Sequence, residues 1–220
     1  MAKKTLKALA ILSLLAFLNG TAMAANNATS TTTGANNLST ITQSGDGQTA
    51  DVTQNGDDND SNVDQSNLDN TATVNQSNGE NVSIVDQSGV GNVATVDQDD
   101  DNTSIVNQSG DGNNADVNQS GNPAPPTNEQ NLSVIDQSGD DNTATVSQDD
   151  RNRSNVNQTG DGNTANVDQT GFVGFDDNVS DVQQSGNDNT ASVTQNGDLN
   201  NSRVNQEGDL NDATVDQSGT

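Results

Sequence analysis

The sequence predicts an all-β chain: a two-sheet parallel β-solenoid of the cross-β type, built from eight strand–turn–strand rungs of about 22 residues each. Three observations predict it. The pattern N-x-S-x-(V/I)-x-Q, four turn residues, then N-x-A-x-V-x-Q recurs in eight copies, constrained positions alternate with variable ones, and Gly follows most of the repeated Gln residues at a fixed distance. Such a fixed period is typical of a stack in which each repeat buries its inner face against its neighbours.

The alternation within each half-repeat indicates a β-strand with one specified face. That face carries β-branched residues such as Val63 and Val74 beside small Ser or Ala, which lets two sheets approach closely. The other face carries Thr, Asp and Asn, as expected for solvent. A helix would need a period of about 3.6 residues, which the repeats do not show.

Turn residues mark the end of each half-repeat. The second residue after the repeated Gln is Gly in twelve of sixteen cases, and Asn67, Asn78, Asp100 or Asp150 in the others. These residue types tolerate positive φ best, so we expect one tight turn per half-repeat. Strand, turn, strand and turn then make one flat coil, and successive coils pair in parallel about 4.8 Å apart.

We expect three parts along the chain. Residues 1–24 have the layout of a secretory signal peptide, with three lysines, a short apolar stretch and a small-residue cleavage site; an uncleaved membrane anchor is the alternative. Residues 25–36 form a polar leader that we expect to be flexible. Residues 37–220 form the solenoid, with loop insertions near 122–130, which holds all three prolines, and near 172–177. The second insertion carries Phe172 and Phe175, which leaves a contact with a partner as the alternative to a tolerated loop.

Composition excludes several function classes. The chain has no Cys and no His, so disulfides are absent and zinc or haem sites lack their usual ligands. The net charge of −26 argues against nucleic acid as a partner, and no segment after residue 24 is apolar enough for membrane insertion. The carboxylate pairs, such as Asp99 and Asp100, lie in repeated turns without a basic partner or pocket. We therefore expect no enzymatic activity and no cofactor.

Asn and Gln recur at fixed inward positions, and they are the candidate functional residues. A buried amide is costly when unpaired, but it can bond up and down a column of identical amides and so fix the register of the rungs. The expected Gln ladder contains Gln43, Gln54, Gln65, Gln76, Gln87, Gln98, Gln108, Gln119, Gln137, Gln148, Gln158, Gln169, Gln184, Gln195, Gln206 and Gln217. The expected Asn ladder contains Asn37, Asn59, Asn81, Asn92, Asn102, Asn113, Asn131, Asn142, Asn152, Asn163, Asn178, Asn189, Asn200 and Asn211.

The half-repeat N-x-A-x-V-x-Q-x-G-x-x-N, as in residues 163–171, resembles the curlin repeat of curli, the extracellular amyloid fibres of Gram-negative bacteria. The resemblance covers residues 37–217. It is strongest to the major structural subunit, because the final repeat is regular. This chain departs from the curlin pattern in three ways: Asn opens the first strand where curlins often have Ser, the repeats are more numerous, and the acid content is much higher.

The resemblance implies a secreted structural subunit that self-assembles head to tail into extracellular amyloid fibres, for biofilm matrix and surface adhesion. It implies that the partners are other copies of the chain, a nucleator subunit, and an outer-membrane secretion channel with its accessory proteins. It also implies export through the periplasm to a fibre at the cell surface, with residues 25–36 where curlins keep a secretion-targeting segment. The Gln, Asn and Gly positions of the repeat, such as Gly45, would then serve strand stacking.

Two other functions stay open: an acidic calcium-binding solenoid and an ice-binding solenoid. Acidic turns offer the oxygen ligands that Ca²⁺ prefers, although the Gly-Gly-x-Gly-x-Asp calcium repeat is absent. Thr71 and Thr73 would start outward Thr rows of the kind that bind ice, but Asp51, Asn114 and Asp116 stand at equivalent positions.

The acidic side chains predict that electrostatic repulsion influences assembly. Asp64 and Asp86 fall in one outward column, and two carboxylates about 5 Å apart repel by roughly 0.8 kcal/mol in water. We therefore expect the charge to oppose premature growth. The regular last repeat predicts an open strand edge that templates another copy by strand addition.

Overall fold

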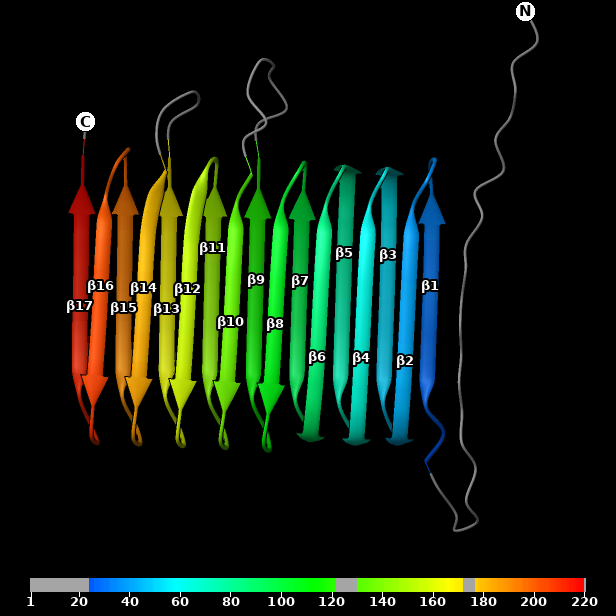
Figure 1. The fold of residues 1–220 in the computed structure, drawn as a ribbon, viewed down its shortest axis with the longest axis horizontal. Coiled ribbons are helices and arrows are strands. Elements are labelled where there is room, and N and C mark those ends of the chain that lie inside the picture. Colours follow the sequence, from blue (N-terminus) through cyan, green and yellow to red (C-terminus); the bar gives the residue numbers. More distant parts are fainter. Residues whose placement is uncertain (1–23, 122–129, 172–176, 220) are drawn as a thin grey trace, which may run out of the picture.

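The computed structural model describes residues 24–121, 130–171 and 177–219, which form two parallel β-sheets that face each other (Figure 1). The chain alternates between the sheets, so odd-numbered strands make a nine-stranded sheet, here sheet A, and even-numbered strands make an eight-stranded sheet, here sheet B. The predicted all-β parallel solenoid is thereby confirmed. Each rung combines one strand of sheet B with the following strand of sheet A, from rung 1 (β2 and β3) to rung 8 (β16 and β17).

The strands are seven to nine residues long. Sheet A contains β1 (Asn27–Thr33), β3 (Thr49–Asp57), β5 (Thr71–Gly79), β7 (Val93–Asp99), β9 (Asn114–Ser120), β11 (Thr143–Asp149), β13 (Thr164–Thr170), β15 (Thr190–Asn196) and β17 (Asp212–Ser218). Sheet B contains β2 (Leu38–Asp46), β4 (Asp60–Leu68), β6 (Val82–Val90), β8 (Thr103–Ser109), β10 (Leu132–Ser138), β12 (Asn152–Thr159), β14 (Asn178–Ser185) and β16 (Asn201–Glu207).

Identical repeat positions stack directly on one another, because every strand pairs with its equivalent one rung away. Val63 pairs with Val85 and Gln65 with Gln87, for example. Column neighbours are usually 22 or 21 residues apart, but 29 residues separate Asn102 from Asn131. The register continues across that longer connection. The insertions predicted near 122–130 and 172–177 lie almost wholly outside the described residues.

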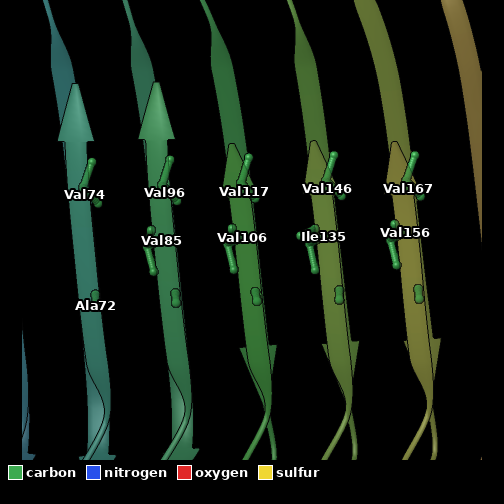
Figure 2. Close-up of a cluster of buried hydrophobic side chains, with 14 of the residues drawn as sticks. Ala72, Val74, Val85, Val96, Val106, Val117, Ile135, Val146, Val156 and Val167 are labelled. Atoms are coloured by element: carbon green, nitrogen blue, oxygen red, sulfur yellow. The ribbon is translucent and has the colours of Figure 1, made fainter. Parts of the chain in front are cut away.

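A thin apolar core lies between the sheets (Figure 2). One row of Val side chains comes from sheet A, including Val74 and Val96, and a second row comes from sheet B, including Val85 and Val106. All four are fully buried, and so are Ala72 and Ala94 in the column of small Ala side chains beside the Val row of sheet A. Burial alternates with exposure along each strand, as the sequence pattern predicts. Burying one Val contributes about 1.5–3 kcal/mol, so the repeated column is the main apolar contribution to stability.

The turns use positive φ at thirteen of the sixteen expected positions. The nine glycines have φ between 90° and 133°, whereas the four Asn and Asp residues have φ between 60° and 75°. The expectation is wrong for Gly121, Gly171 and Gly219, which do not have positive φ. Gly121 and Gly171 directly precede residues 122–129 and 172–176, which lie outside the described residues.

The expectation that residues 25–36 are flexible is wrong for their central part, because residues 27–33 form β1. This strand pairs in parallel with β3 and adds the ninth strand to sheet A. The leader holds Asn26 and Ala28 at the Asn and Ala positions of a half-repeat, and the backbone N–H of Gln48 donates to Asn26 Oδ1 at 3.0 Å. It therefore folds as a partial half-repeat.

The predicted signal peptide lies outside the described residues except for Ala24. Among the residues that the structure describes, no helix is long and apolar enough to cross a membrane.

Candidate functional site

The Gln residues form two continuous ladders, one in each sheet. The side-chain amide of every ladder Gln except Gln206 and Gln217 donates to Oε1 of the Gln one rung closer to the C-terminal end, over 2.7 to 3.0 Å. The second amide N–H donates to a backbone carbonyl of the opposite sheet, as from Gln108 to Val93 at 3.0 Å. Each Gln therefore joins neighbouring rungs and also ties the two sheets together.

The Asn ladders run at the starts of the strands with the opposite direction. In most steps of the Asn ladders, Oδ1 of one Asn accepts the backbone N–H of the equivalent residue in the next rung, as Asn113 accepts from Asn142 at 3.0 Å. The side-chain amide of Asn113 donates to turn carbonyls, those of Ser109 and Gly139. These contacts satisfy buried backbone groups at the turns, so the Asn columns hold each turn against the next one.

The predicted ladder residues lie together in these columns. All are buried except Asn200, Asn211 and Gln217, which belong to rung 8 and are partly exposed. Gln48 and Asn70 were missed, although both are fully buried at Asn-column positions of sheet A. The eleven-residue spacing back from Asn59 and Asn81 was the signal for them. Gln48 is one methylene longer than Asn, and its Oε1 has no hydrogen-bond partner.

The two ends of the stack present different ladder groups. At the N-terminal end, the Oε1 atoms of Gln43 and Gln54 are buried and have no hydrogen-bond partner. At the C-terminal end, Gln206 donates to the carbonyl of Thr190 and Gln217 to that of Asn201. No described Gln lies beyond them to accept the second amide N–H. One end therefore offers acceptors and the other offers donors.

The acid lies on the outward faces and in the turns. Asp64 pairs with Asp86 in the outward column of sheet B; burial raises the pKa of Asp64, and the neighbouring charge raises it further. Burial also raises the pKa of Asp116, with a smaller contribution from Asp97. No group of three or more acidic side chains among the described residues converges to hold a metal ion.

These shifts predict that the stack is more stable in mild acid. A carboxyl with a raised pKa binds protons more tightly in the folded than in the unfolded chain, so stability rises as pH falls through the raised pKa toward the ordinary value. We expect the urea midpoint to be higher at about pH 4 than at pH 7. Asp64→Asn should raise the pH 7 midpoint and reduce the pH dependence. Equal midpoints at both pH values would contradict this.

Comparison with known proteins gives one family match. A family model described as curlin associated repeat matches residues 34–66, 129–149 and 186–219. These segments contain rung 1 and rung 8 and all of the strands of rung 5, β10 and β11. No curated protein and no solved structure matches the chain.

Proposed function

On the premise that this chain belongs to the curlin family, we propose that it is a secreted structural subunit that self-assembles head to tail into curli-like amyloid fibres. The family match and the parallel stack of identical rungs support this proposal. In a cross-β fibre, strands also stack in register perpendicular to the fibre axis. One subunit is then a short length of fibre, and growth repeats between copies the pairing that exists within one copy.

The unpaired ladder ends are the observation that carries the proposal. Soluble proteins usually protect exposed strand edges, and a buried acceptor without a partner costs free energy. In a joint between copies, the amide of Gln206 would donate to Oε1 of Gln43, and that of Gln217 to Oε1 of Gln54. Joining two N-terminal ends would place acceptor against acceptor. The ladder direction therefore favours a head-to-tail polymer.

The fibre would serve biofilm matrix and adhesion outside the cell, as the family membership suggests. Residues 1–24 would direct export to the periplasm, and an outer-membrane channel of the curli type with its accessory proteins would carry the chain out. The family also suggests a nucleator subunit as the starting surface. The regular ladders of rung 8 support the role of a major subunit, because that rung repeats the pattern of the rungs before it.

Purified chain without residues 1–24 should form unbranched fibres that bind thioflavin and diffract with a meridional reflection at about 4.8 Å. A chain that stays monomeric under all conditions would contradict the proposal. If that monomer gained thermal stability steeply with Ca²⁺, the calcium-binding alternative would replace it. Thermal hysteresis on freezing would favour the ice-binding alternative.

A further inference from the structure

The two sheets are unequal in a way that matters for a joint between copies. Sheet A has nine strands and sheet B has eight, because β1 adds one strand to sheet A before rung 1. The chain alternates strictly between the sheets from β1 to β17, so it begins and ends in sheet A. In a seamless continuation after β17, the next strand of sheet B is β2 of the following copy, and the next strand of sheet A is its β3.

Strand β1 occupies the place that this continuation needs. It is paired with the edge of β3 that β17 of the preceding copy would pair with. If β1 stayed there, β17 would stack on β1, and β16 would face β2 across a missing strand, at about 10 Å instead of about 5 Å. Hydrogen bonds across sheet B would then be lost at every joint.

We propose that β1 is a place-holder strand, which β17 of a second copy displaces from β3 when subunits join. This inference rests on the proposed self-assembly. The place-holder covers the sheet A edge of a free subunit, and so protects it from wrong pairing until a matching rung arrives.

The inward residues of β1 fit the β3 edge less well than those of β17. Ala28 keeps the Ala position, as Ala213 does in β17. Ser30 stands opposite Val52, at the position where a full half-repeat has Val, so the apolar row of sheet A is interrupted there. Thr32 stands opposite Gln54, whose Oε1 is left unpaired.

Strand β17 would correct both defects. By the register of β1 on β3 and of β17 on β15, Val215 would replace Ser30 opposite Val52, and Gln217 would replace Thr32 opposite Gln54. The amide of Gln217 would then supply the donor that Gln54 Oε1 lacks, over the geometry that joins Gln195 to Gln217 at 2.9 Å within the chain. The exchange buries one more Val and pairs one more acceptor.

The outward faces also match at this joint. In the same register, Asp212 would lie opposite Thr49, Thr214 opposite Asp51, and Asp216 opposite Thr53. No carboxylate is placed directly opposite another in these three positions, unlike Asp64 and Asp86 within the chain. The acidic surface therefore does not oppose this particular pairing at close range.

Disulfide trapping tests the exchange, because the chain has no Cys of its own. Equimolar T53C and D216C chains are assembled and then oxidised. A disulfide needs a distance of about 4.4–6.8 Å between Cα atoms, and residues opposite each other on paired strands meet this condition. We expect covalent dimers from this mixture and none from T31C with D216C, the matched pair for a joint that keeps β1.

Dimers from T31C with D216C, or fibres without dimers from T53C with D216C, would overturn the displacement of β1 alone. Absence of fibres from every mixture would overturn the self-assembly and the displacement together.

A lock within one chain gives an independent measurement. In T31C/T53C the two positions are paired between β1 and β3, and oxidation before assembly should slow elongation on fibre seeds about tenfold or more, with recovery on reduction. The control N157C/Q183C links β12 to β14, which stay paired in any joint, so its oxidation should not change the rate. S30V/T32Q, which gives β1 the Val and Gln of a full half-repeat, should slow elongation as well. Equal elongation rates for the oxidised and reduced T31C/T53C chain would overturn the proposal.

Discussion

Gln184→Leu is expected to lower the free energy of unfolding by about 2–4 kcal/mol, whereas Gln183→Leu should change it by less than about 0.5 kcal/mol. The two residues are neighbours on β14, and the substitutions are chemically identical. Only the direction of the side chain differs, because successive residues of a strand point to opposite faces.

The large effect follows from three hydrogen bonds that Gln184 makes inside the stack. Its Oε1 accepts from Gln158 at 2.9 Å, and its amide donates to Gln206 Oε1 at 2.8 Å and to the carbonyl of Thr164 at 3.0 Å. Leu has a similar size but removes all three. One donor on Gln158 and one acceptor on Gln206 then stay buried without a partner, and each unsatisfied group costs about 1–3 kcal/mol.

Gln183 is the control position for the effect at Gln184. Gln183 faces outward and is only partly buried, with one contact to Asp181 at 3.3 Å. Urea unfolding of the soluble chain measures the stability difference, and growth on preformed seeds measures its consequence for assembly. If the two variants lost the same stability, the ladder would not be the source of specific stacking.

The fold could be predicted from sequence because its period is strict. The alternation predicted that Val74 and Val85 are buried, and the spacing predicted that the Gln residues stack in register. The residue type two positions after each repeated Gln predicted positive φ at Gly45. The directions of the ladders could not be predicted, because the recurrence of Gln or Asn does not show which neighbour donates the hydrogen bond and which accepts it. The bonds from each Gln to the opposite sheet also depend on the distance between sheets, which only the folded packing sets.

Two misses have a common cause, which is reliance on the full motif. The strand β1 was not predicted, because Ser30 and Thr32 replace the Val and Gln that define a half-repeat. Asn26 and Ala28 alone do not identify a half-repeat. Gln48 escaped because it replaces the expected Asn. In both places the backbone keeps the repeat geometry although the side chains depart from it, since pairing with the next rung supplies most of the constraint.

The residues two positions after each repeated Gln fall into two classes of backbone conformation, which their residue types did not predict. Asn67 and Asp100 lie at φ of 75° and 60°, in the left-handed region that Asn and Asp tolerate. Gly110 and Gly139 lie at 99° and 104°, beyond that region. Glycine is the residue that adopts such φ values readily, and these positions also need glycine for a second reason.

That second reason is close approach between rungs, and it predicts a large effect for Gly139→Ala. A Cβ added at Gly139 would overlap the backbone carbonyl oxygen of Gly160 in the next rung, and backbone cannot yield as a flexible side chain can. Together with the φ of 104°, we expect a loss of about 2 kcal/mol or more in the free energy of unfolding. The urea midpoint of the soluble chain is the measurement.

Gly91→Ala is the matched control, because it separates backbone conformation from stacking. Gly91 also has positive φ, at 70°, but a Cβ added there meets nothing within 4 Å. Its substitution should therefore cost only the conformational term, about 1 kcal/mol, and Gly91→Asn should cost still less. The cost at Gly139 in excess of that at Gly91 measures how tightly one turn must pack on the next. If Gly139→Ala and Gly91→Ala lost equal stability, contact between turns would not limit the approach of the rungs, and the ladders alone would set their spacing.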